Sequence, residues 1–268
     1  MRIIYFLKFS FLIFCIAASL SLAETAEEKG YEIAARSDRS DRGFGDNEVT
    51  ATMILRNGKG QESRRVVFQR TFEIQDEDKG DLGIIVFEDP ADVEGTALLS
   101  HAKILEPDDQ WLYLPALKRV KRISSKNKSG PFVGSEFAFE DFTSQELNKY
   151  SYKYLREEPC PNLPEVTCDV LERYPEYEFS GYAKQVSWVD QKDFQTRQVD
   201  FYDRRDSLLK TMTFEDYKLY QDKYWRAQTL KMVNHVNGKS TDFLFSDYKF
   251  GLGLSENDFV KGVLKRVR

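Results

Sequence analysis

The chain has 268 residues, of which 41% are hydrophobic and 14% aromatic, and its formal net charge is −5 at pH 7. An acidic chain argues against nucleic acid as the main partner, because nucleic acids bind strongly basic surfaces. The sequence has two histidines, His101 and His235, and shows no nucleophile elbow, phosphate-binding glycine loop or metal-ligand cluster. We therefore expect a protein without catalytic residues, metal or cofactor.

The N-terminal segment, residues 1–23, has the pattern of a secretory signal peptide. Basic residues flank an apolar run that ends in small residues at Ala23, and this pattern predicts cleavage after that residue. The apolar run is shorter than the ~20 residues that a membrane span needs. Cys15 follows Phe14, where a lipoprotein signal requires a small residue. We expect an exported mature chain, residues 24–268, that forms one domain.

The mature chain begins with an amphipathic pattern and then changes period. Ala26, Gly30, Ile33 and Ala34 recur at helical spacing, which predicts a helix over residues 24–41. From residue 49 onwards apolar and polar residues alternate, which predicts strands. These strands cover residues 49–55, 65–74, 82–87, 97–105, 110–123, 150–155, 166–174, 183–189, 195–202, 208–215, 224–236 and 240–245.

The end of the chain predicts a second helix. Ser255 and Asp258 have the spacing of an N-terminal cap, and a helix over residues 255–264 is expected after them. About a dozen short strands with one helix at each end do not fit a parallel β–α–β arrangement. They fit one long antiparallel sheet, which must curl or close to protect its edges. The fold class is therefore mainly β, either a barrel or a strongly curved sheet.

Two cysteines remain in the mature chain, Cys160 and Cys168. They enclose a turn-rich segment with two prolines, and in an exported protein such an isolated pair is typical of a disulfide. A zinc site needs further ligands, and both histidines are far away in the sequence. We predict a structural disulfide.

The segment over residues 110–142 combines three kinds of chemistry. It reads QWLYLPALKRVKRISSKNKSGPFVGSEFAFEDF. An aromatic strand is stopped by Pro115, a basic run follows, and then a loop broken by glycines carries several phenylalanines. The aromatic and aliphatic residues that we expect to line or cover a binding site are Trp111, Tyr113, Leu114, Phe132, Phe137 and Phe139.

The basic run has three interpretations. Its central residues are Lys118, Arg119, Lys121 and Arg122. They can protect a sheet edge against aggregation, bind an acidic partner protein, or contact anionic lipid headgroups at a membrane surface. The neighbouring aromatic loop favours the two binding interpretations, since a cationic rim beside an apolar opening suits a carrier of amphipathic molecules.

The same segment carries a resemblance to a known family. WLYLPALKRVKRI followed by PFVGSEFAFEDF resembles the LolA-like periplasmic proteins, the outer membrane lipoprotein-sorting proteins. The similarity runs from RSDRSDRGFGDNEVTATMIL to SDYKFGLGLSENDF, which is nearly the whole mature chain. The resemblance implies an unclosed β-barrel covered by helices, with an apolar cavity between the sheet and its lid.

Two functions follow from these expectations. The first is a periplasmic, non-enzymatic carrier that buries lipid or lipoprotein acyl chains in the cavity, moves them toward the outer membrane and contacts a membrane surface transiently. The alternative is an accessory subunit of an envelope export machine, in which the basic run contacts a partner such as an inner-membrane RND-type transporter. Bound lipid in the detergent-free protein would distinguish the carrier from the subunit.

Overall fold

The computed structural model describes residues 23–76 and 78–266. The signal peptide predicted for residues 1–23, with Cys15, lies outside the described residues except for Ala23. Among the described residues, no helix is both long and apolar enough to cross a membrane.

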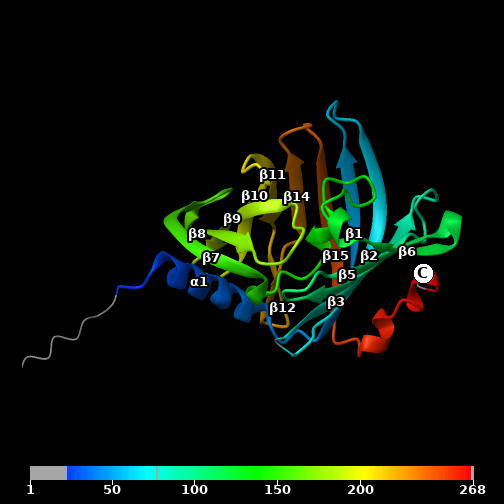
Figure 1. Cartoon of the computed structure of the whole chain (residues 1–268), viewed down its shortest axis with the longest axis horizontal. Coiled ribbons are helices and arrows are strands. Elements are labelled where there is room, and N and C mark those ends of the chain that lie inside the picture. The colour runs from blue at the N-terminus through cyan, green and yellow to red at the C-terminus, as the bar shows by residue number, and fades with distance from the viewer. Residues whose placement is uncertain (1–22, 77, 267–268) are drawn as a thin grey trace, which may run out of the picture.

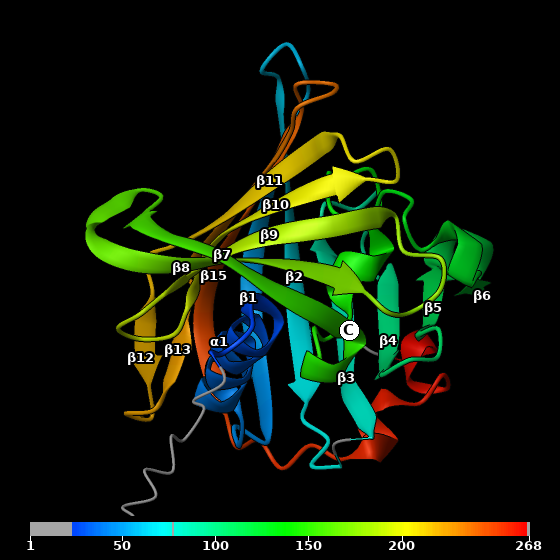
Figure 2. The same cartoon turned by 60° about the vertical axis from the view of Figure 1, so that its left-hand side comes forward.

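A single antiparallel sheet of thirteen strands dominates the molecule (Figures 1 and 2). Its strand order is β6-β5-β4-β3-β2-β1-β15-β14-β11-β10-β9-β8-β7. The two edge strands, β6 and β7, do not pair with each other, so the curved sheet stays open as an unclosed barrel. The strands are β1 (Asp46–Arg56), β2 (Glu62–Phe72), β3 (Lys79–Asp89), β4 (Ala97–Lys103), β5 (Asp109–Leu114), β6 (Arg119–Ile123), β7 (Tyr150–Cys160), β8 (Leu163–Pro175), β9 (Tyr182–Asp190), β10 (Thr196–Asp203), β11 (Leu208–Glu215), β14 (Thr229–Asn234) and β15 (Ser240–Phe250). A separate two-stranded sheet contains β12 (Lys218–Tyr220) and β13 (Tyr224–Arg226).

The one α-helix of the described residues, α1 (Ala26–Asp41), packs against β7. Thr25 and Glu28 form a capping box at its start, which satisfies free backbone N–H groups there. Gly30 allows a close approach, since a Cβ at this position would lie 2.7 Å from the backbone nitrogen of Tyr154. The helix therefore covers the β7 end of the open barrel (Figure 2).

Alternate residues of the strands pack on opposite faces of the sheet. Val67, Ile85 and Phe87 belong to the core inside the curve, which we call the inner face. Phe68 and Ile84 belong to a second core on the other side, the outer face, where the C-terminal segment packs. The inner face also receives the long loop between β6 and β7, residues 124–149, which we call the central loop.

Three expectations about the elements need correction. The strand predicted for residues 110–123 is interrupted by a 3-10 turn at Pro115–Leu117, because Pro115 offers no N–H to the ladder and starts a corner between β5 and β6. The strand predicted for residues 224–236 is divided between β13 and β14, and the short β12 was not anticipated.

The helix predicted for residues 255–264 is also wrong. Two 3-10 turns, Glu256–Phe259 and Val263–Lys265, form there instead. Phe259 and Leu264 are both buried in the outer-face core, and Gly262, a poor helix former, lies between the two turns. Burial of these two anchors overrides the helical pattern.

Candidate functional site

The central loop fills part of the space inside the curved sheet. Phe132 is fully buried, and its ring lies 5.6 Å from that of Phe87 and 4.4 Å from that of Phe142. Phe137 meets Phe243 edge to face at 5.0 Å. These aromatic contacts make the loop an interior plug that packs against the inner face.

Buried charges fix this plug in position. The Lys210 ammonium lies 2.7 Å from an Asp141 carboxylate oxygen, and the two side chains are 4% and 6% exposed. The Tyr182 hydroxyl donates to the other carboxylate oxygen at 2.7 Å, and the Ala138 N–H also donates to Asp141. Removing one partner of such a pair leaves an uncompensated buried charge, so the network ties the loop firmly to β9 and β11.

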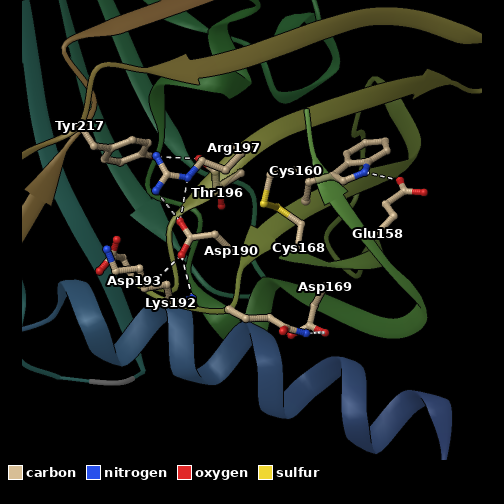
Figure 3. Close-up of a disulfide and its surroundings, with 12 residues drawn as sticks. Glu158, Cys160, Cys168, Asp169, Asp190, Lys192, Asp193, Thr196, Arg197 and Tyr217 are labelled. Atoms are coloured by element: carbon tan, nitrogen blue, oxygen red, sulfur yellow. Dashed lines mark hydrogen bonds and ion pairs between the residues drawn. A yellow bond between two sulfur atoms is a disulfide. The ribbon is translucent and has the colours of Figure 1, made fainter. Parts of the chain in front are cut away.

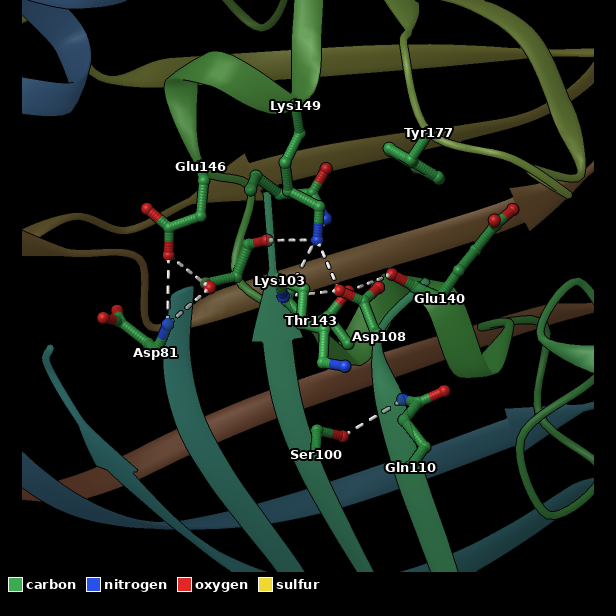
Figure 4. Close-up of polar contacts among 12 residues, drawn as sticks. Asp81, Ser100, Lys103, Asp108, Gln110, Glu140, Thr143, Glu146, Lys149 and Tyr177 are labelled. Carbon is green, nitrogen blue, oxygen red and sulfur yellow. Dashed lines mark hydrogen bonds and ion pairs between the residues drawn. The ribbon is translucent and has the colours of Figure 1, made fainter. Parts of the chain in front are cut away.

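A second buried pair holds the far end of the central loop (Figure 4). The Lys149 ammonium lies 2.8 Å from a carboxylate oxygen of Asp108, and both side chains are buried. Nearby, Gln110 on β5 donates to the Phe139 carbonyl at 2.7 Å and to the Ser100 hydroxyl at 3.0 Å. The loop is thus joined to both halves of the sheet.

One carboxyl of the plug is electrostatically unusual. Burial and the neighbouring Asp141 carboxylate raise the pKa of Glu140 to about 7, although Gly181 N–H donates to it at 2.9 Å. Close by, burial lowers the pKa of Lys128. The Lys128 ammonium lies 3.9 Å from the centre of the Tyr177 ring, and no hydrogen-bond partner for it is found among the described residues.

A cavity of about 580 Å³ remains between the plug, the sheet and α1. Its volume falls within the range of small-molecule sites in proteins. One wall is apolar and comes from β11, β14 and β15, where Phe214, Leu230 and Phe243 occupy paired positions on three neighbouring strands. The other wall, from β7 to β9 and the turn between β8 and β9, is more polar and contains Tyr150, Tyr152, Arg173, Tyr177 and Gln185. The arrangement suits an amphipathic ligand with an apolar body.

The C-terminal half of α1 lines one end of the cavity, where charged groups gather. Arg42 binds Asp38 at 2.7 Å and lies 3.5 Å from Glu146 of the central loop. The other Glu146 oxygen accepts from the Asp81 N–H at 3.1 Å (Figure 4). Burial and the nearby Glu146 charge raise the pKa of the Asp81 carboxyl to about 7. Polar contacts of Glu146 therefore join the central loop to the end of α1 and to β3 at this end of the cavity.

The structure separates the six residues expected at the binding site. Phe137 lines the cavity. Phe132 and Phe139 lie inside the plug, with ring centres 5.7 Å apart, and Leu114 packs against the same inner core. Trp111 and Tyr113 point to the outer face and pack near Phe259.

The cavity wall also contains residues that the sequence did not single out. They are mainly Met212, Phe214, Leu230, Phe243 and Phe245. Their alternation marks them as inward-facing strand residues, but it carries no signal for which inward-facing positions stay uncovered. The basic residues Lys118, Arg119, Lys121 and Arg122 are exposed at the β6 edge of the sheet, away from this wall.

The predicted disulfide between Cys160 and Cys168 is confirmed (Figure 3). It joins β7 to β8 near the tip of their hairpin, in a small core with Trp188. Glu158 accepts from the Trp188 indole N–H at 2.6 Å, so the hairpin is fixed by polar contacts as well. The bond clamps the edge hairpin on which α1 rests.

Comparisons with known proteins agree with this architecture. A model of a protein family described as an uncharacterized protein matches residues 79–266. The crystal structure of a putative outer membrane lipoprotein-sorting protein domain from Vibrio parahaemolyticus is 51% identical, with a TM-score of 0.86, over 90% of this chain and all of that one. The chain belongs to the family of outer membrane lipoprotein-sorting proteins.

Two further solved structures extend the comparison. A DUF1329 family protein from Desulfovibrio piger is 29% identical, with a TM-score of 0.83, over 90% of this chain and 99% of that one. A LolA superfamily protein from Nitrosomonas europaea is 20% identical, with a TM-score of 0.69, over 87% and 98% of the two chains, and shows the shared fold. No curated protein matches the chain. The LolA-like lipoprotein-sorting fold supports a carrier-type role.

Proposed function

We propose that this protein is a periplasmic carrier that shelters lipid or lipoprotein acyl chains in the cavity between the curved sheet and α1. The observation that supports it most directly is the apolar row of Phe214, Leu230 and Phe243 on three paired strands, which borders the cavity and in which Phe214 and Leu230 are only partly buried. Covering apolar surface of this kind with an acyl chain removes it from water, which is favourable. Delivery toward the outer membrane, and a non-enzymatic mode of action, belong to the same proposal.

The energetic requirement for such a carrier is modest. Each buried CH₂ contributes roughly 0.8 kcal/mol, so about ten of them supply on the order of 8 kcal/mol before the entropic cost of binding. Because the entropic cost is subtracted from this figure, the complex is micromolar at the tightest, which holds a chain yet still releases it. A cavity of about 580 Å³, with polar groups such as Arg42 and Glu146 in its lining, fits this compromise.

Binding of a fluorescent long-chain fatty acid tests the proposal. Leu230→Asp places a carboxylate on the apolar wall and should weaken binding at least about tenfold, because a charge loses water when the chain covers it. Val233→Asp is the matched control, since Val233 lies on the same strand but is exposed. It should bind as the unmodified protein does.

Two results would reject the carrier. One is a detergent-free protein that binds no acyl chain, and the other is equal weakening by both substitutions. Native mass spectrometry of protein purified without detergent supplies a second readout, since a carrier should retain lipid. An empty protein in a stable complex with another envelope protein would favour the accessory-subunit alternative. None of the similar proteins described above is known from its description as a partner of an RND-type transporter, so that partner is not part of the proposal.

A further inference from the structure

The outer face of the sheet carries a second hollow, remote from the cavity. Its volume is about 720 Å³, and it is open to solvent. It forms where the β5–β6 hairpin meets the C-terminal segment. Its lining residues are Trp111, Lys118, Arg119, Val120, Arg122, Lys261, Gly262 and Lys265, so five of the eight are cationic and none is acidic.

Two chain segments that are far apart in sequence bring these cations together. In the β5–β6 hairpin, Arg122 lies opposite Trp111 in the strand register. Lys118 lies at the corner of the hairpin, in the left-handed backbone conformation with a φ of 48°. In the C-terminal segment, Phe259 and Leu264 are buried in the outer-face core, on either side of Lys261. The cationic side chains therefore project from fixed backbone.

Further contacts hold the C-terminal segment in place. The Asp46 carboxylate accepts from the N–H groups of Leu252, Gly253 and Leu254 at 2.6 to 3.1 Å. His101 forms a hydrogen bond of 2.6 Å with the Phe259 carbonyl. Because the segment is fixed before any ligand arrives, little ordering entropy remains to be lost on binding.

The positive charge of the hollow is largely uncompensated. Arg122 forms an ion pair with Asp109. Among residues 23–76 and 78–266, no acidic side chain lies within ion-pair distance of the other four lining cations, Lys118, Arg119, Lys261 and Lys265. The Lys261 ammonium lies 5.0 Å from the centre of the Trp111 ring. Several cations around one hollow favour an anionic ligand with several acceptor oxygens.

Exposed apolar residues flank the cations on both segments. Leu117 is 62% exposed and directly precedes Lys118, and Val260 is 44% exposed and directly precedes Lys261. Cations beside exposed aliphatic side chains suit the boundary between phospholipid headgroups and acyl chains, where both kinds of group are satisfied. An acidic peptide or free phosphate uses the cations but leaves the aliphatic groups in water.

We propose that this hollow binds the phosphate groups of anionic phospholipids and docks the protein on a bilayer surface. Lys261 and Lys265 complete the site that the basic run of β6 begins. The site lies on the face opposite the acyl-chain cavity, so docking on a membrane and sheltering a chain use separate surfaces. The proposal therefore stands or falls independently of the carrier function.

Vesicle binding by the full mature chain tests the site. The probes are phosphatidylcholine vesicles with and without phosphatidylglycerol, and binding is measured by co-sedimentation at low and high salt. We expect binding only with phosphatidylglycerol and a marked loss at high salt, because exposed charge attraction is screened. The double variant K261Q/K265Q should bind at least about tenfold more weakly.

The matched control is K59Q/K239Q, which removes the same charge from the tips of two distant hairpins. It should bind within about twofold of the unmodified chain, since charges more than a Debye length away are screened. Leu117→Ser should weaken vesicle binding while leaving any competition by inorganic phosphate unchanged. Circular dichroism melting curves check that each variant is folded.

Three outcomes overturn the proposal. The first is no binding to phosphatidylglycerol vesicles. The second is equal weakening by K261Q/K265Q and K59Q/K239Q, which means that net charge alone is responsible. The third is binding of inorganic phosphate without vesicle binding, which assigns the hollow to a free anion. Failure of fatty-acid binding in the cavity leaves all three tests unaffected.

Discussion

Glu140 gives the sharpest quantitative test of how the central loop is held. Its carboxyl is buried, next to the Asp141 carboxylate, and its pKa is raised from 4.5 to about 7. A carboxyl that is harder to ionise in the folded protein than in the unfolded chain stabilises the fold at acidic pH. This contribution is fully present below about pH 4.5 and is lost as the pH rises through about 7.

The magnitude follows from the two pKa values. Each pKa unit corresponds to about 1.4 kcal/mol, so the whole contribution of Glu140 amounts to about 3 kcal/mol. Between about pH 5.5 and about pH 8, roughly 2 kcal/mol of it should disappear. In Glu140→Gln this proton-linked contribution is absent, while the side chain can still accept a hydrogen bond from Gly181 N–H.

The assay is urea unfolding at these two pH values, followed by tryptophan fluorescence. The unfolding free energy of the unmodified protein should fall relative to Glu140→Gln by about 2 kcal/mol as the pH rises. Comparing the two proteins cancels the groups that titrate alike in both. Glu165→Gln, at an exposed position of β8, controls for the loss of one carboxyl. Parallel pH dependence in the unmodified protein and Glu140→Gln would show that Glu140 is not held as described.

Three further sets of substitutions test the disulfide, the packing of α1 on β7 and the buried Lys210–Asp141 pair. Replacing Cys160 and Cys168 by Ser should lower stability by about 2.5 kcal/mol on the chain-entropy model for a loop this short, and reductant should then no longer affect the melting temperature. Gly30→Ala should destabilise by about 1–3 kcal/mol despite the better helix former, because its Cβ overlaps the β7 backbone; a rise in melting temperature would contradict this packing. Lys210→Met should lower stability by about 3–5 kcal/mol, because it leaves the Asp141 carboxylate buried without its partner. In a double-mutant cycle, Lys210→Met with Asp141→Asn should lose clearly less stability than the sum of the two single losses. Additive losses would mean that the two side chains do not interact.

Much of the fold follows from local sequence signals. The alternating pattern from residue 49 onwards identifies the inward and outward residues of the strands. The Asn57-Gly58 and Asn237-Gly238 pairs predict hairpins, which appear as β1–β2 and β14–β15. Where the prediction failed, longer-range packing decided the outcome: Phe259 and Leu264 gain more by lying in the outer core than the segment gains from a continuous helix.

The candidate site was less predictable than the fold. The central loop was expected to cover a cavity near Trp111, but alternation along β5 sends Trp111 and Leu112 to opposite faces. Inward-facing positions that border the cavity and those that do not are both apolar, so the alternating pattern does not distinguish Phe243 from Met232. Only the folded chain shows that Phe243 borders the cavity. The meeting of Lys118 and Lys261 also depends on tertiary structure, since 143 positions separate them.

The distribution of buried charge indicates which part of this molecule can move to admit a ligand. The central loop is tied down by the pairs Lys210–Asp141 and Lys149–Asp108, both buried, so moving it exposes uncompensated charges. The C-terminal half of α1 is held by Asp41, which pairs with Arg226, and by Ser37, which donates to the Phe194 carbonyl. Its contact with the central loop runs through the more exposed Arg42, which lies 3.5 Å from Glu146. We expect the polar seam between Arg42 and Glu146 to open at a lower free-energy cost than the aromatic plug, because its charges are more exposed than those of the two buried pairs. The loop that dominates the sequence pattern is therefore the fixed floor of the cavity, held by buried charges at both of its ends.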